Sequence, residues 1–261
     1  MIRPKKSLGQ NFLNNGVVLD NIVNNGNINK DDIILEIGPG TGKLTEKIVK
    51  KKPSKIIVVE KDKALSDFLK TKFGDNIKII NEDILEYIKI LKFDKPIKVF
   101  GNLPYNISTK ILTSIIKKDN LNNIFSLLIF VFQKEVADRI VAEYNTKQYG
   151  RLSILSSWKM YRKKMFDISP KNFFPIPKVC SSLVLLKPRD KIDNLKKSKN
   201  LEHITNIFFN QKRKMIKKPM KQLFINYEIV AKKLKLDLNN RPQNLSVSNY
   251  LEICKFYENL N

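Results

Sequence analysis

The sequence predicts an α/β fold with a mainly parallel sheet and a small helical second domain. Short apolar segments rich in β-branched residues recur along the first two thirds of the chain, with helical stretches between them. A glycine-rich turn directly follows the first of these segments, where doubly wound sheets bind ligands. After residue 187 the apolar segments stop and a basic, helical pattern takes their place.

Each predicted strand is short and almost wholly apolar, as strands buried on both faces of a parallel sheet are. Between the last two of them, the spacing of apolar residues predicts a helix over residues 133–142. We expect strands at residues 33–37, 55–60, 77–80, 97–100, 124–132 and 182–186.

The C-terminal part concentrates much of the positive charge. Residues 187–235 hold 15 basic and 4 acidic residues, a local net charge of +11. Ile204, Ile207 and Phe208 have the i, i+3, i+4 spacing of an amphipathic helix. We therefore divide the chain into a larger domain of residues 1–187 and a basic helical domain of residues 188–261.

The composition excludes several classes of protein. The 261 residues contain 49 Lys and Arg against 25 Asp and Glu, a net charge of +24, yet 42% are apolar, which disordered basic tails are not. The longest apolar run, Ile124–Phe132, is broken by Ser126 and is too short to span a membrane. Although A/T-rich codons explain part of the lysine excess, the charge indicates a polyanionic partner, either nucleic acid or an anionic membrane surface.

Cysteine and histidine usage indicates neither disulfides nor metal. Only Cys180 and Cys254 are present, without CxxC or Cys/His clustering, so we expect no metal site and a reducing cytosol. No apolar segment follows the N-terminal charges, as a secretory signal requires, so we expect a cytoplasmic protein. Trp158 and Cys180 are expected in the core, and His203 at an exposed helix position.

The turn after the first strand predicts a cofactor site. Glycines at 38, 40 and 42 let the backbone turn sharply and approach a ligand before a helix begins. The dinucleotide fingerprint requires its third glycine one position later, where Lys43 stands, and no phosphate-loop pattern is present.

Acidic residues follow the next two strands. Glu60 ends the second strand, where a carboxylate can accept both hydroxyls of a ribose, and Asp83 follows the third, where it can accept an adenine amino proton or be a solvated loop acid. A nucleoside-containing cofactor is predicted, either a nicotinamide or S-adenosylmethionine.

The fourth strand decides between these cofactors because it ends in Gly101–Asn106, with the sequence Gly-Asn-Leu-Pro-Tyr-Asn. The side-chain carbonyl of Asn102 and the main-chain carbonyl of Leu103 or Pro104 can accept hydrogen bonds from the two N–H groups of an exocyclic amino group and stabilise charge that develops during methylation. Tyr105 can stack on the base. The target base must be unpaired or flipped out to reach these groups.

At this point the chain resembles the KsgA-type small-subunit ribosomal RNA adenine dimethyltransferases over nearly its whole length. The matching segments are Lys6–Leu13, Glu36–Thr45, Gly101–Ser108, Gln133–Ala137, Tyr149–Ser153, Phe173–Val179, Gln211–Lys214 and Leu245–Val247.

The resemblance implies a Rossmann-like class I S-adenosylmethionine-dependent methyltransferase fold in residues 1–187. It makes Asn102 to Tyr105 the catalytic loop and Phe173 a second stacking surface for the adenine. The alternatives for this second surface are that Phe173 is a core aromatic and that the neighbouring Phe174 takes the role. The residues expected to hold S-adenosyl-L-methionine are Asn11, Leu13, Gly38, Gly40, Glu60, Asp83 and Asn102.

The implied reaction is two successive methyl transfers to each of two adjacent adenosines in the 3′-terminal hairpin of small-subunit (16S) rRNA, within an immature subunit. We expect a monomer that binds neither metal nor membrane. Residues 188–261 are expected to bind rRNA or the ribosome, because their cations suit phosphates. The cations expected to contact RNA are Lys212, Arg213, Lys214, Lys217 and Lys218.

Three alternatives share some of these features. Macrolide-resistance methyltransferases act on an adenine of 23S rRNA, but more often carry Ile where Leu103 stands. DNA adenine methyltransferases carry Pro or a similar residue there and a large target-recognition domain. An assembly factor that checks the immature subunit, with catalysis secondary, would not need all of Gly38, Glu60, Asp83 and Asn102.

Overall fold

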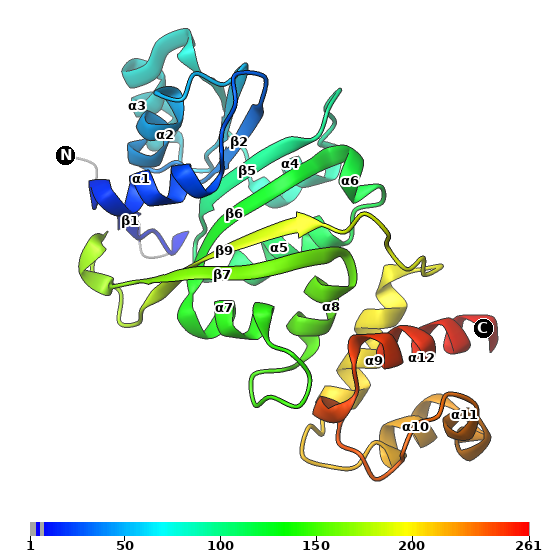
Figure 1. Cartoon of the computed structure of the whole chain (residues 1–261). Coiled ribbons are helices and arrows are strands. Elements are labelled where there is room, and N and C mark those ends of the chain that lie inside the picture. The colour runs from blue at the N-terminus through cyan, green and yellow to red at the C-terminus, as the bar shows by residue number, and fades with distance from the viewer. Residues whose placement is uncertain (1–3, 6–7, 261) are drawn as a thin grey trace. The chain divides into compact units, whose positions relative to one another are not determined.

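The computed structural model describes residues 4–5 and 8–260, so Lys6 and Ser7 of the first matching segment lie outside the described residues. Seven strands of the described chain form a sheet in the order β4-β3-β2-β5-β6-β9-β7 (Figure 1). They are β2 (Ile33–Ile37), β3 (Lys55–Val59), β4 (Lys78–Ile80), β5 (Ile97–Asn102), β6 (Phe125–Gln133), β7 (Met160–Ile168) and β9 (Ser181–Pro188).

The sheet is mainly parallel, as predicted. Strand β2 pairs in parallel with both β3 and β5, β4 continues on β3 and β6 on β5, whereas β9 runs antiparallel to β6. Strands β3 and β4 follow β2 on one side of the sheet, and β5 and β6 follow on the other side. The strand order therefore reverses between β2 and β5. Sheets of this kind bind ligands at the carboxyl ends of the strands beside such a reversal.

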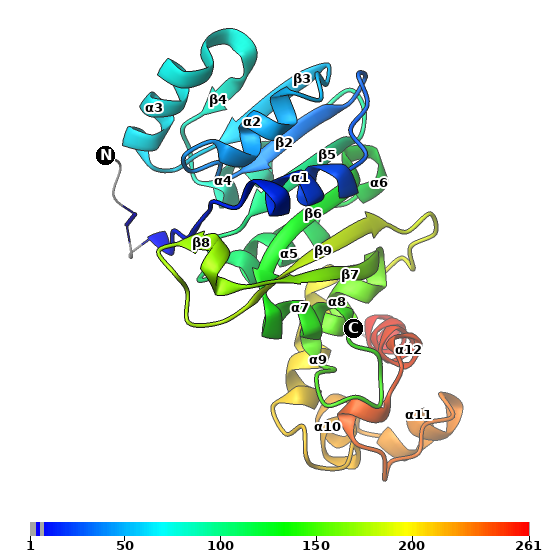
Figure 2. The ribbon, with the colours of Figure 1, turned by 60° about the vertical axis from the view of Figure 1, so that its left-hand side comes forward.

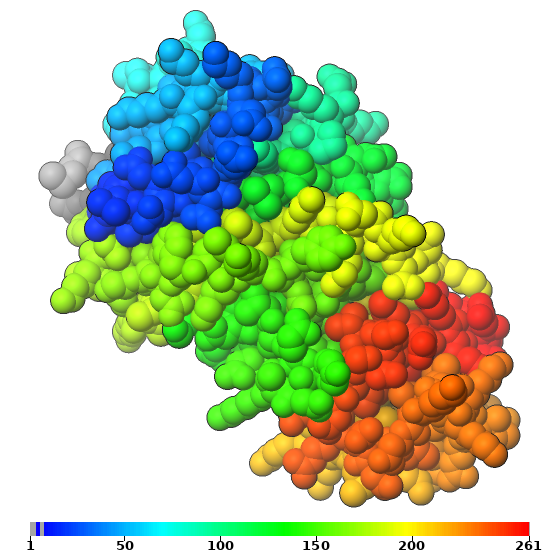
Figure 3. Space-filling view, viewed as in Figure 1, coloured from blue at the N-terminus to red at the C-terminus, as the bar shows by residue number. Residues whose placement is uncertain are grey.

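Helices cover both faces of this sheet (Figure 2), and its strands other than β7 are therefore mainly apolar. On one face, Leu19 and Ile22 of α1 join Ile34, Phe100 and other strand residues in the main core. The space-filling view shows α1 in dark blue at the surface of this side (Figure 3). The helices of the sheet region are α1 (Gly16–Asn25), α2 (Lys43–Val49), α3 (Lys63–Phe73), α4 (Ile84–Ile90), α5 (Ser108–Ile116), α6 (Leu121–Ile124) and α7 (Lys134–Val141), with short 3₁₀ turns at Gly74–Asn76 and Pro170–Asn172.

Three strands were not predicted. Strand β7 carries Arg162, Lys163 and Lys164 in its middle, so it lacks the continuous apolar run of the other strands. Strands β1 (Phe12–Leu13) and β8 (Phe173–Phe174) are two residues each and pair antiparallel with one another. The strands and the helix that were predicted lie within two residues of their expected bounds.

The chain divides into two compact units. The first contains the residues up to Ala137 and Arg162–Pro188, and the second contains Asp138–Tyr161 and the residues from Arg189 onward. This division differs from the predicted boundary after residue 187, because residues 138–161 group with the C-terminal part.

The second unit is helical after residue 189, as predicted, and Figure 1 shows α12 beside α9. The rings of Phe208 and Tyr250 join these two helices edge to face, with centroids 5.3 Å apart. Glu258 accepts main-chain hydrogen bonds from Lys196 (2.8 Å) and Lys197 (3.0 Å) at the start of α9. The helices are α8 (Arg151–Lys159), α9 (Ser198–Phe209), α10 (Lys217–Leu223), α11 (Tyr227–Lys233) and α12 (Val247–Leu260), with a 3₁₀ turn at Pro242–Asn244.

Three expectations for single residues have clear outcomes. Trp158 is buried and His203 lies exposed on α9, both as predicted. Cys180 was expected in the core, but it is exposed just before β9, so that prediction is wrong. Within the described residues, no helix is both long and apolar enough to cross a membrane.

Candidate active site

Glycines form the turn between β2 and α2. Gly38 and Gly40 have φ values of 64° and 58°, which side chains other than glycine rarely adopt. A Cβ at Gly40 would lie 2.8 Å from the ring of Phe12, whereas a Cβ at Gly38 would meet nothing within 4 Å. The turn therefore brings bare backbone to the edge of an open space.

Glu60 follows β3 and reaches back to this turn. Its Oε2 accepts a hydrogen bond from the Gly40 N–H at 3.2 Å and its Oε1 one from the Asp62 N–H at 2.9 Å. Burial raises the pKa of Glu60, although these two hydrogen bonds act in the opposite direction. Because a carboxylate offers about four lone-pair sites, Glu60 can still accept hydrogen bonds from a ligand.

Asp83 follows β4 and caps helix α4. Its Oδ1 accepts the Leu85 N–H at 2.8 Å, and its Oδ2 forms an ion pair with Lys61 at 2.9 Å. Burial alone would raise the pKa of Asp83, but the contacts with Lys61 and Leu85 outweigh it and lower the pKa. Asp83 is therefore a charged acceptor at neutral pH.

Glu36 lies inside β2, beneath the glycine turn, and is 1% exposed. Its Oε2 accepts a hydrogen bond of 2.7 Å from the Thr45 hydroxyl. Burial raises the pKa of Glu36 from 4.5 to about 8, because the hydrogen bond from Thr45 only partly offsets the desolvation and the charge of Glu60 adds to it. The carboxyl group is mainly protonated at pH 7.

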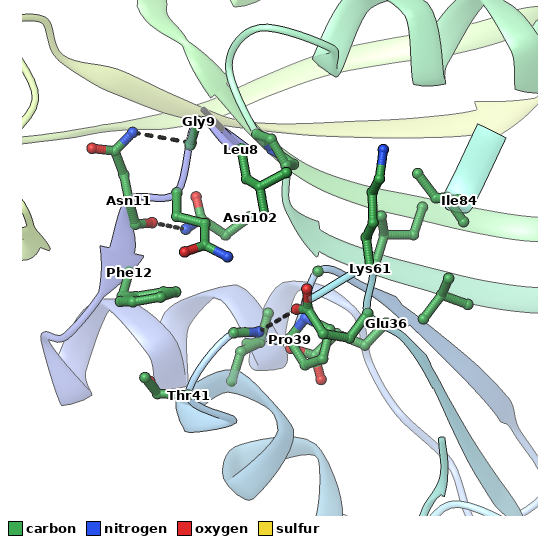
Figure 4. Close-up of a pocket in the computed structure, with 18 of the residues that line it drawn as sticks. Leu8, Gly9, Asn11, Phe12, Glu36, Pro39, Thr41, Lys61, Ile84 and Asn102 are labelled. Atoms are coloured by element: carbon green, nitrogen blue, oxygen red, sulfur yellow. Dashed lines mark hydrogen bonds between the residues drawn. The ribbon is translucent and has the colours of Figure 1, made fainter. Parts of the chain in front are cut away.

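These groups share one cavity of about 190 Å³ at the carboxyl ends of β2, β3, β4 and β5 (Figure 4). Every residue predicted to hold the cofactor lines it. The lining includes Asn11, Leu13, Gly38, Gly40, Glu60, Asp83 and Asn102, together with Leu8, Phe12, Glu36, Lys61, Pro104 and Asn106.

The side-chain amide of Asn102 is fixed by the N-terminal segment. Its Nδ2 donates a hydrogen bond of 2.6 Å to the main-chain carbonyl of Asn11 (Figure 4). Its Oδ1 is buried and has no hydrogen-bond partner among the described residues. Because buried polar atoms are nearly always paired, this oxygen is available to accept a hydrogen bond from a group outside the described residues.

The remaining residues of the predicted catalytic loop differ in exposure. Pro104 lines the cavity, and its carbonyl accepts a hydrogen bond of 3.1 Å from the Ile107 N–H. Leu103 is 1% exposed and is not among the residues that line the cavity. Tyr105 is half-buried, and its hydroxyl shares a hydrogen bond of 2.6 Å with that of Ser181.

Comparison with known proteins agrees with this geometry. The model of the family "Ribosomal RNA adenine dimethylase" matches residues 1–259. The chain belongs to this family. The "Ribosomal RNA small subunit methyltransferase A" of Pelagibacter ubique is 53% identical over 259 residues, covering 99% of this chain and 98% of that protein.

Two solved structures resemble the adenine dimethylase fold seen here. A dimethyladenosine transferase from Plasmodium falciparum has a TM-score of 0.76 at 25% identity, covering 93% of this chain and 95% of the other. The 23S rRNA methyltransferase ErmE has a TM-score of 0.69 at 19% identity, covering 95% and 99%, and this likeness concerns the fold alone. The predicted Rossmann-like class I methyltransferase fold is confirmed.

Phe173, expected from the adenine dimethylase resemblance to stack on adenine, is a buried residue. It is 3% exposed, belongs to the main core and does not line the cavity. The physical reason is the β1–β8 register, which sets Phe173 opposite the core residue Leu13 and sets Phe174 opposite Phe12. Successive strand residues point to opposite faces, so Phe174, which is 56% exposed, shares a face with the cavity residue Phe12.

Lys212, the first cation predicted to contact RNA, is used within the second unit. Its Nζ donates hydrogen bonds to the main-chain carbonyls of Lys147 (2.6 Å) and Tyr149 (2.9 Å). Burial and the nearby positive charges of Arg139 and Lys147 lower its pKa. Two segments that match the adenine dimethylases, Gln211–Lys214 and Tyr149–Ser153, therefore meet at this lysine.

The other four predicted cations extend into solvent. Arg213, Lys214, Lys217 and Lys218 are exposed.

No cluster of His, Cys, Asp and Glu in the described part of the chain has the size to hold a metal ion.

The cavity residues that the prediction from sequence missed include Phe12, Lys61 and Asn106. Phe12 stands between two residues that were predicted, Lys61 directly follows Glu60, and Asn106 directly follows the predicted catalytic loop. Only their adjacency to predicted residues could have indicated them.

Proposed function

We propose that the protein transfers methyl groups from S-adenosyl-L-methionine to the exocyclic amino groups of adenosines in small-subunit rRNA. The observation that carries the proposal is the buried Oδ1 of Asn102, an acceptor without a partner among the described residues, at the edge of the cavity. More specifically, the proposed targets are two adjacent adenosines of the 3′-terminal hairpin in an immature subunit, each of which is methylated twice. We further propose that the protein acts as a monomer in the cytoplasm.

The residues of the cavity suit this cofactor. Bare backbone at Gly38 leaves space for a ligand, Glu60 offers carboxylate oxygens to ribose hydroxyls, and Asp83 offers a charged acceptor to an adenine amino group. Asn11 and Leu13 close the cavity from the N-terminal segment. When bound, S-adenosylmethionine supplies an electrophilic methyl group carried on a positively charged sulfur.

Asn102 and a neighbouring main-chain carbonyl would act on the target amino group. The nitrogen lone pair of adenine is delocalised into the ring, and hydrogen bonds accepted from both amino N–H groups favour the pyramidal, nucleophilic form. The Asn102 Oδ1 accepts one of these hydrogen bonds. The main-chain carbonyl of Leu103 or of Pro104 accepts the other, since the Pro104 carbonyl keeps a free lone pair beside its hydrogen bond from Ile107. No strong base is needed, since the proton can leave after transfer.

Tyr105 would hold the base in place. A base stacked within an RNA helix cannot bring its amino group to the Asn102–Tyr105 loop, so the target base is flipped out or already unpaired. The aromatic face of Tyr105 then stacks on it. Burial raises the pKa of the phenol and the proximity of Cys180 adds to this, while the hydrogen bond with Ser181 opposes it, so Tyr105 stays uncharged at neutral pH.

The test is transfer of labelled methyl groups to undermethylated small subunits. We expect dimethyladenosine as the product from small subunits, and no label in naked large-subunit RNA. Label in large-subunit RNA with none in small subunits would contradict the proposed substrate. Binding to immature subunits without any transfer would instead support the assembly-checkpoint role.

A further inference from the structure

The hydroxyl of Tyr105 is held by a residue that does not line the cofactor cavity. Ser181 lies at the start of β9, is 0% exposed, and its Oγ is 2.6 Å from the Tyr105 Oη. The other end of Tyr105 is also held, because its main-chain carbonyl accepts a hydrogen bond of 3.3 Å from Ser108. The ring is thus tied at its hydroxyl to the sheet and at its backbone to α5.

The anchor itself is rigid. Ser181 pairs with Gln133 at the end of β6, and the main-chain N–H of Lys134 donates a hydrogen bond of 2.9 Å to the carbonyl of Cys180. A hydroxyl mounted on two paired strands is more precisely placed than one on a loop. The segment Gln133–Ala137 thus contributes the strand end on which Ser181 is fixed.

We propose that Ser181 is a positioning residue for methyl transfer, which fixes the Tyr105 ring in the orientation that stacks on the target base. This inference rests on the proposed function of the site. Tyr105 stands three residues after Asn102 in the same loop, so a tilted ring would move the base relative to the Asn102 amide. Ser181 acts on the reaction only through the Tyr105 hydroxyl.

Ser182 provides a matched control. It is the next residue of the same strand and equally buried, but its hydroxyl donates to Asp167 at 2.7 Å instead of to Tyr105. The two serines point to opposite faces of β9. Replacing each with alanine removes the same atom from the same strand.

The first experiment is a double-mutant cycle on single-turnover methyl transfer, using small subunits. A neutral hydrogen bond contributes about fivefold to a rate that depends on it. We expect Ser181→Ala and Tyr105→Phe each to lower the rate about fivefold, and the double variant to lower it no further. Ser182→Ala should transfer at the wild-type rate, and cofactor affinity should be unchanged in all four.

Two kinetic results would overturn the proposal. If Tyr105→Phe transfers at the wild-type rate, the hydrogen bond merely satisfies a half-buried phenol. If the effects of Ser181→Ala and Tyr105→Phe multiply, the serine acts by another route than this hydroxyl.

A second measurement does not depend on the substrate. Protein carrying ¹³C-labelled tyrosine gives ring signals by NMR, and the signal that disappears in Tyr105→Phe belongs to Tyr105. Ser181→Ala should shift or broaden that signal, whereas Ser182→Ala should not. An unchanged signal in Ser181→Ala would overturn the proposal even if the methylation substrate proved to be different, while failure of wild-type transfer alone would contradict only the proposed function.

Discussion

The side-chain amide of Asn102 donates a hydrogen bond of 2.6 Å to the main-chain carbonyl of Asn11, a residue 91 positions earlier in the chain. An amide held by its nitrogen presents its oxygen in a fixed direction. That oxygen is buried at the cofactor cavity without a partner in the described part of the chain. The N-terminal segment therefore both lines the cavity and orients the acceptor on which the proposed chemistry depends.

Phe173 and Phe174 should differ in what they contribute. Phe173→Ala should lower the free energy of unfolding by about 3 to 5 kcal/mol, because it empties a core site. Phe174→Ala should change it by less than about 0.5 kcal/mol, because the side chain is mostly exposed. Urea denaturation measures both. Equal effects of the two substitutions would show that Phe173 and Phe174 do not lie in the β1–β8 register that buries only the first.

Glu36 should make stability depend on pH. Its pKa is about 8 in the folded protein against an ordinary value of 4.5, so between these values the folded state binds the proton more tightly than the unfolded state. The free energy of unfolding then falls as pH rises through this range, by at most about 1.4 kcal/mol per pH unit, and levels off above pH 8.

Glu36→Gln removes the ionisable carboxyl group and retains an oxygen that can accept the hydrogen bond from the Thr45 hydroxyl. Relative to the wild type, the variant should therefore become more stable as the pH is raised from about 5 to about 8, as measured by urea denaturation at each pH. A stability difference that stays constant over this range would contradict a protonated Glu36.

The exposed cations of the second unit should account for RNA affinity, and Lys212 for stability. Arg213→Gln with Lys214→Gln should reduce the slope of log affinity against log salt by about 1.4 to 1.8, the effect of two lost phosphate contacts. Filter binding to small subunits at several salt concentrations measures the slope. An unchanged slope in the double variant would show that these two cations do not contact RNA.

Lys212→Met should instead lower the melting temperature, because two main-chain carbonyls lose their hydrogen-bond donor.

Sequence patterns predicted the parts of the fold that are encoded locally. The apolar strands β2 to β6, the turn at Gly38 and Gly40, and the acids Glu60 and Asp83 all stand where a short segment indicates them. Strand β7 was not predicted because Arg162, Lys163 and Lys164 in its middle interrupt the apolar pattern of its ends.

The features that could not be predicted come from pairing between distant segments. The assignment of Phe173 was made without the β1–β8 register, which places it in the core. Neither the contact of Asn102 with Asn11 nor that of Tyr105 with Ser181 leaves a local pattern, since the partners lie 91 and 76 positions apart.

The central claim is that the Asn102 Oδ1 accepts a hydrogen bond from the target amino group during methyl transfer. The most direct measurement compares wild type and Asn102→Ala in single-turnover methylation of small subunits, with RNA affinity measured separately. We predict a loss of at least about 100-fold in rate with RNA affinity unchanged, as for other preorganised groups that stabilise developing charge. A variant that binds RNA normally and methylates within a few-fold of the wild-type rate would contradict the claim.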